Sequence, residues 1–102
     1  MKNKIFISFL QLLMLATLAI SVAGQSQAGC AWNVDAMQSI AKVRNAPGCE
    51  RVCRGIGSCT HYTWTSGDIC ALVRSKNSIV PAKAPANFVC GFIKGRSAQK
   101  PF

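Results

Sequence analysis

Cysteine is the residue type with the most clearly defined chemistry in this sequence. An even number of cysteines in a short exported chain predicts disulfides, because the exported compartment is oxidising. Counting alone allows fifteen pairings of six cysteines. A metal site is the alternative, but the chain has one histidine, His61, and no CxxC pair. We therefore expect three disulfides, no metal and no cofactor, from Cys30, Cys49, Cys53, Cys59, Cys70 and Cys90.

The groups that could perform acid–base or nucleophilic catalysis are few. General acid–base catalysis needs two paired carboxylates, or a histidine with an orienting partner. Beyond the first 24 residues the chain has only Asp35, Glu50 and Asp68 as carboxylates. Asp35, His61 and a serine could form a triad, but no nucleophile-elbow sequence supports one. Residues 54–57 form no phosphate-binding fingerprint. The sequence predicts a protein that is not an enzyme.

The first 28 residues have the pattern of a secretory signal peptide. Residues 1–4 are positively charged, residues 5–20 are mostly apolar, and small residues come next at 21–23 and 26–28. The apolar run is shorter than the roughly 20 residues that a membrane-spanning helix needs. We expect cleavage after position 23 or position 28, a secreted extracellular protein, and no membrane span.

The chain beyond the signal segment is small and basic. Cleavage leaves 79 or 74 residues, enough for one domain with a modest core that needs covalent staples. Ten cations and three carboxylates lie beyond residue 24, a net charge of +7. Such a charge favours anionic partners, including sulfated glycans, although an ordinary solvated surface is the alternative. Nucleic acid is not expected for an exported domain. The candidate binding cations are Arg51, Arg54 and Arg74, and a basic surface could also include Arg44, Lys76 and Lys83.

One helix and several strands can be predicted around these residues. Pro47 in a first turn and Gly55 as a stop favour a helix over 45–55, with a cap at position 45 or 46. Cys49 and Cys53 are four apart and share one face of it. Strands are predicted at 30–34, 59–65, 69–73 and 88–93, with a turn at 66–68, whereas 39–43 fits an extended piece or helical spacing. Residues 75–87 form a loop with a short extended piece at 79–80, and residues 95–102 a flexible basic tail.

Three aromatic residues are candidate ligand contacts: Trp32, Tyr62 and Trp64. Flat rings can stack on the face of a sugar, but rings also fill small cores. Alternation along the 59–65 strand puts Tyr62 and Trp64 on one face, which favours a core position for Trp64. For Trp32 the two interpretations are evenly balanced.

The cysteines and their neighbours also form an ordered pattern. A Cys-x3-Cys-x5-Cys frame starts at Cys49, an aromatic stretch at 60–65 comes directly after it, and Cys70 begins a Cys-x-Leu motif. With outer cysteines at Cys30 and Cys90, this set resembles the PAN/apple domain family. It looks most like the PAN-type modules of cellulose-binding lectins, and the resemblance covers residues 30–93.

The resemblance implies a small disulfide-rich α+β fold in which a curved antiparallel sheet cradles one short α-helix. It also implies a PAN/apple-like domain over residues 29–94. The turn between Trp64 and Cys70 is shorter than in those lectins, so ligand identity does not transfer if the ligand contacts lie in this turn. The implied disulfides are nested: Cys30–Cys90, Cys49–Cys70 and Cys53–Cys59.

We expect a secreted, non-catalytic binding module for a carbohydrate or an extracellular protein. The candidate contacts are the three aromatic residues and three arginines named above. A cationic host-defence or effector protein acting on anionic membranes is the first alternative, because the domain is small, stapled and basic. A protein-interaction inhibitor is the second, although no reactive-site loop can be identified.

Overall fold

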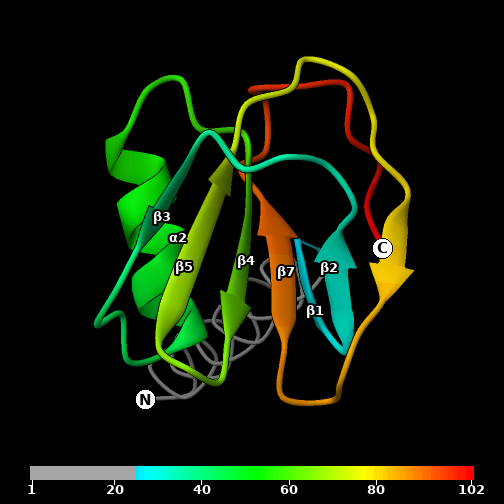
Figure 1. Cartoon of the computed structure of the whole chain (residues 1–102). Helices are drawn as coiled ribbons and strands as arrows, with labels where there is room; N and C mark the ends of the chain where they lie inside the picture. The colour runs from blue at the N-terminus through cyan, green and yellow to red at the C-terminus, as the bar shows by residue number, and fades with distance from the viewer. Residues whose placement is uncertain (1–24) are drawn as a thin grey trace, which may run out of the picture.

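The computed structural model describes residues 25–102, and its main element is a five-stranded antiparallel sheet (Figure 1). The strand order is β1-β7-β4-β5-β3. The central strands β4 and β5 form the hairpin that the sequence predicts, with Thr65 opposite Ile69 and His61 opposite Val73. The strands are β1 (Ser26–Ala28), β3 (Gln38–Ile40), β4 (His61–Thr65), β5 (Ile69–Val73) and β7 (Val89–Phe92).

The sheet is covered by a helix on one face and by a two-stranded ribbon on the other. Helix α2 (Ala46–Gly55) packs against β4, β5 and β7. The ribbon pairs β2 (Cys30–Trp32) with β6 (Pro81–Lys83), and β2 packs against β4 and β7. Tyr62 lies in the core cluster of the helix side, whereas Trp32 lies in the cluster of the ribbon side. The chain is therefore a small disulfide-rich α+β domain, as predicted.

Local signals explain where helix α2 begins and ends. The Asn45 side chain accepts a hydrogen bond from the Gly48 backbone N–H at 2.7 Å, which caps the first turn. The helix ends at Gly55, and the Ile56 N–H returns to the Cys53 carbonyl. Because Cys49 and Cys53 share the buried face, the helix is held to the sheet through its cysteines.

The three disulfides are the pairs that the resemblance implies: Cys30–Cys90, Cys49–Cys70 and Cys53–Cys59. Two of them fasten helix α2, one to strand β5 and one to the loop at the end of the helix. The third joins the ribbon strand β2 to β7, so each covering layer is stapled to the rest of the fold.

Several predicted boundaries differ from the structure. The strand expected at 30–34 stops at Trp32, and the extended piece expected at 79–80 lies at Pro81–Lys83, where it pairs with β2. The piece at 39–43 is not helical: its first two residues belong to the edge strand β3, which pairs with β5, and the rest has no regular structure, with a positive φ at Lys42. Strand β1 was not predicted, because its residues were assigned to the signal segment.

Most of the proposed signal peptide, including the cleavage position 23, lies outside the described residues. Position 28 is the last residue of β1, which pairs with β7. Within residues 25–102, no helix is both long and apolar enough to cross a bilayer.

The segment expected to be a flexible basic tail, residues 95–102, makes contacts with the rest of the domain. Arg96 donates hydrogen bonds to carbonyls at the end of α2, and Gln99 bonds to His61 and Ile79. Phe102 stacks on Trp32. The segment lacks regular secondary structure, so hydrophobic periodicity gave no sign of these contacts. We call residues 96–102 the strap.

Candidate functional site

Of the three candidate aromatic residues, Trp32 and Tyr62 are core residues. Their exposed fractions are 5% and 1%. The Trp32 indole N–H donates to the carbonyls of Tyr62 and Gly91 at 3.0 and 2.9 Å, which fixes the ring against the sheet. Neither ring presents a free face to a ligand in this structure, and both fill the core, which is the other interpretation that the sequence allowed.

The hydrogen bonds of Tyr62 and Trp64 are also structural. The Tyr62 hydroxyl donates to Glu50 Oε1 at 3.3 Å. Burial and the nearby Glu50 carboxylate raise the pKa of Tyr62, so this phenol stays neutral. Half-buried Trp64 donates its indole N–H to the Val43 carbonyl at 2.6 Å and packs against the helix-side core.

The three candidate arginines occupy two different places. Arg51 and Arg54 are exposed on helix α2, where Arg54 forms an ion pair with Glu50 at 3.3 Å. This pair lies within one helix at i,i+4 and contributes little to stability. Arg74 instead lies just beyond the end of β5 and lines a surface hollow.

The hollow has a volume of about 560 Å³ and lies beside the end of helix α2 and the end of strand β5. Arg74 and Lys76 are exposed there, and neither belongs to an ion pair among the described residues. No carboxylate lines the hollow, so its charge is entirely positive. The lining residues are Gly57, Ser58, Thr60, Arg74, Ser75, Lys76 and Arg96, and we call this site the basic hollow.

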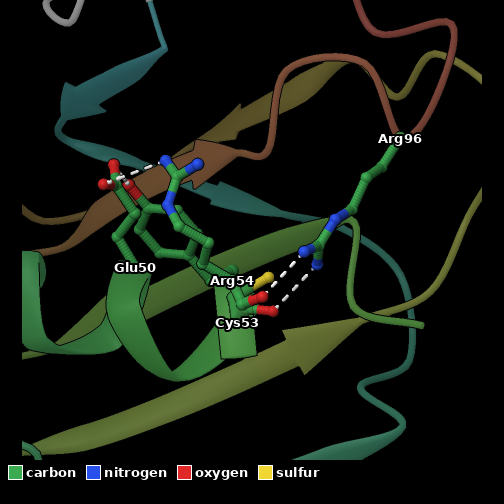
Figure 2. Close-up of polar contacts among 5 residues, drawn as sticks. Glu50, Cys53, Arg54 and Arg96 are labelled. Atoms are coloured by element: carbon green, nitrogen blue, oxygen red, sulfur yellow. Dashed lines mark hydrogen bonds and ion pairs between the residues drawn. The ribbon is translucent and has the colours of Figure 1, made fainter. Parts of the chain in front are cut away.

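Arg96 connects the basic hollow to helix α2 (Figure 2). Its Nη1 donates to the Cys53 carbonyl at 3.1 Å, the contact drawn in Figure 2. The same nitrogen donates to the carbonyls of Ile56 and Cys59 at 2.9 and 3.0 Å. Its Nη2 donates to the Arg54 carbonyl at 2.7 Å. The last carbonyls of a helix have no partner within the helix, and a cation at this end complements the helix dipole.

This capping by Arg96 also matters for the charge of the hollow. The C-terminal end of a helix carries a partial negative charge that repels anions. Because the Arg96 guanidinium covers these carbonyls, the negative end of α2 is neutralised on the side where Gly57 and Ser58 line the hollow. The basic hollow can thus accept an anionic group beside a helix end that would otherwise disfavour it.

His61 is fully buried, and its two ring nitrogens have partners that are not carboxylates. Nδ1 lies 2.7 Å from Thr60 Oγ1, and Nε2 lies 2.9 Å from Gln99 Oε1. Gln99 Oε1 also accepts from the Ile79 N–H, and Gln99 Nε2 donates to the Ile79 carbonyl, which fixes the amide orientation. The amide oxygen can only accept, so His61 carries its proton on Nε2. Burial lowers the pKa of His61, although the Gln99 hydrogen bond opposes this, and the ring is neutral at pH 7.

Sequence reasoning missed Arg96 and Gln99. Both were assigned to a flexible tail, and a single basic or polar residue in such a segment carries no signal of its contacts. The glycine at position 95 was a weak indication of a turn, and in the structure Gly95 has a positive φ of 88° where the chain turns into the strap.

Within residues 25–102, no three side chains among histidine, cysteine, aspartate and glutamate are grouped to hold a metal ion.

Comparisons of the chain with protein-family models, with curated proteins and with solved structures found no match.

Proposed function

We propose that this chain is a secreted, non-catalytic PAN/apple-like binding module whose basic hollow holds an anionic group of an extracellular carbohydrate, such as a sulfate. The observation that carries the proposal is a hollow in which Arg74, Lys76 and Arg96 stand beside three hydroxyl side chains, with no carboxylate in the lining. Arginine and lysine supply charge and hydrogen bonds to sulfate oxygens, and the hydroxyls of Ser58 and Ser75 can supply further donors, whereas the Thr60 hydroxyl is engaged with His61.

Two further observations support this proposal. Trp32 and Tyr62 are buried, so neither of these rings offers a neutral sugar an open face in this structure, and charge becomes the stronger basis for recognition. The cysteine frame, the three disulfide pairs and the single helix on an antiparallel sheet agree with what a PAN/apple-like domain implies. An oxidising extracellular location fits a domain in which all six cysteines are paired.

The membrane-active alternative has less support. An interfacial helix needs a free apolar face. The apolar face of α2 is occupied, because Cys49 and Cys53 are tied by disulfides and Val52 packs against the core.

Binding of a heparin-derived hexasaccharide and of its desulfated form, measured by isothermal titration calorimetry at low and moderate salt, tests the proposal. We expect binding of the sulfated form only, weakening as salt rises because the contacts are charged. Removing two hollow cations, in Arg74→Ala with Lys76→Ala, should weaken binding at least tenfold.

The matched control is Arg51→Ala with Lys83→Ala, which removes the same charge outside the hollow. We expect a loss of threefold or less, because only the general attraction is reduced. Equal losses for the two double variants would show that net charge rather than the hollow binds the ligand. A wild-type chain that binds neither hexasaccharide would contradict the proposal.

A further inference from the structure

The strap covers the aromatic side chain of Trp32. The Phe102 ring stacks on Trp32 with 5.8 Å between ring centroids and 29° between the planes. The His61 ring meets Trp32 nearly edge-on, at 4.8 Å and 79°. Phe102 therefore covers a face of the indole, and its ring also contacts Phe92.

The Trp32 ring does not depend on Phe102 for its position. Its N–H donates to the carbonyls of Tyr62 and Gly91, on two neighbouring strands of the sheet. Phe102, in contrast, is 40% exposed, so its own burial is incomplete. When Phe102 moves away, the indole stays in place and an aromatic face opens.

Gln99 forms hydrogen bonds with the polar groups beside this face. Its side-chain oxygen accepts from the Ile79 N–H at 2.7 Å and faces His61 Nε2 at 2.9 Å. Its side-chain nitrogen donates to the Ile79 carbonyl at 3.1 Å. When the strap leaves, the N–H groups of His61 Nε2 and of the Ile79 backbone become free donors, and the Ile79 carbonyl becomes a free acceptor. All three groups are uncharged.

We propose that Trp32, His61 and the Ile79 backbone form a second binding site, for the ring of a neutral sugar, which the strap occupies in the free protein. A pyranose ring presents a C–H face to an indole, and each hydroxyl can both donate and accept a hydrogen bond. Gln99 and Phe102 take the places of the hydroxyls and of the sugar ring. Figure 1 shows the end of the chain beside β6, which pairs with the strand that carries Trp32.

This site is distinct from the basic hollow, because its groups carry no charge and its binding does not depend on salt. Arg96 is the one strap residue that lines the hollow, so the experiment changes only residues 99 and 102 and leaves Arg96 in place. The strap competes with the sugar for the same groups. The unmodified chain therefore binds neutral oligosaccharides weakly, and weakening the strap strengthens that binding.

The experiment uses the full chain with Gln99→Ala and Phe102→Ala, titrated with maltohexaose and chitohexaose by calorimetry. A Trp64→Phe background leaves Trp32 as the sole tryptophan, so its fluorescence reports the opening. We expect red-shifted emission, stronger quenching by acrylamide, and at least one of the two sugars bound tenfold or more tightly than by the unmodified chain, without dependence on salt.

The control is Met37→Ala, which removes a side chain of similar exposure, 42%, away from the strap and changes neither readout. Retained binding of the sulfated hexasaccharide at the basic hollow establishes that the strap variant is folded. If the hollow binds no probe, a cooperative thermal unfolding transition of the oxidised variant serves the same purpose.

Two results would overturn the proposal. One is an unchanged Trp32 emission in the folded strap variant, which would mean that no face opens. The other is an exposed Trp32 that still binds neither sugar.

Discussion

At the scale of single residues, close contacts in the sheet restrict which side chains the fold accepts. Gly91 lies in β7 opposite Tyr62 in β4. A Cβ atom at position 91 would overlap the Tyr62 hydroxyl and ring. Tyr62 cannot easily yield, because it is buried and its hydroxyl bonds to Glu50.

We therefore predict that Gly91→Ala lowers the free energy of unfolding by about 2–3 kcal/mol, the usual cost of overpacking a filled core. Urea denaturation measures it. Gly57→Ala is the control, because a Cβ there meets nothing within 4 Å, and its effect should stay below about 0.5 kcal/mol. Equal effects of the two substitutions would contradict the contact between Gly91 and Tyr62.

Because His61 is buried, we predict that the free energy of unfolding depends on pH. Burial lowers the pKa of His61 below the ordinary value of 6.5. Between the two pKa values the unfolded chain binds more protons than the folded one, so stability falls as pH decreases through 6.5 and levels off below the folded pKa. His61 is the only histidine of the chain, which assigns the effect to it. Titration of its ring protons by NMR, together with urea denaturation from pH 7.5 to 5, checks this; a pKa at or above 6.5 would contradict it.

At the scale of elements, the end of helix α2 depends on a residue far away in the sequence. Arg96 satisfies four carbonyls in and just beyond the last turn. We predict that Arg96→Ala lowers the free energy of unfolding by about 2 kcal/mol, because hydrogen bonds from a charged donor are lost. Arg96→Lys should recover part of this loss.

The control for Arg96 is Lys94→Ala, two residues earlier and exposed. It removes the same charge without a helix contact and should change stability by less than about 0.5 kcal/mol. Amide hydrogen exchange of residues 53–56 adds a local readout, since protection should decrease there in Arg96→Ala only. Unchanged protection would mean that the strap does not cap the helix.

The sequence was informative about elements with local signals. Asn45, Pro47 and Gly55 mark the helix by capping and turn chemistry, and the β4–β5 hairpin is predicted by β-branched residues around a short turn. Strands β1 and β6 have three residues each and exist because they pair with distant strands, so no periodicity reveals them. The same reason applies to the strap, whose contacts come from Arg96, Gln99 and Phe102 individually.

At the scale of the whole molecule, the candidate site was predictable in its charge but not in its geometry. The net charge predicts an anionic partner, and Arg74 was among the candidate residues. Which cations gather in one hollow depends on how the end of β5, the loop after α2 and the strap meet. The burial of Trp32 was not predictable either. It results from the ribbon and the strap, and no sequence pattern indicated that these two segments meet.

The disulfides should contribute unequally to the stability of this small domain. A disulfide stabilises mainly by restricting the unfolded chain, more so for longer loops. Cys30–Cys90 spans 60 residues and Cys53–Cys59 spans 6, which correspond to about 4 and about 2 kcal/mol. Small domains have total stabilities of roughly 5–15 kcal/mol, so loss of the longer link removes a large part.

We predict that replacing Cys30 and Cys90 by alanine lowers the free energy of unfolding by about 1–2 kcal/mol more than replacing Cys53 and Cys59. The two variants are matched, because each removes two buried sulfurs and leaves similar cavities. Urea denaturation of the oxidised proteins, with unfolding slopes compared, measures the difference. Equal losses would mean that the link between the ribbon and β7 does not act through the entropy of the unfolded chain, and that local packing around the sulfurs determines the stability.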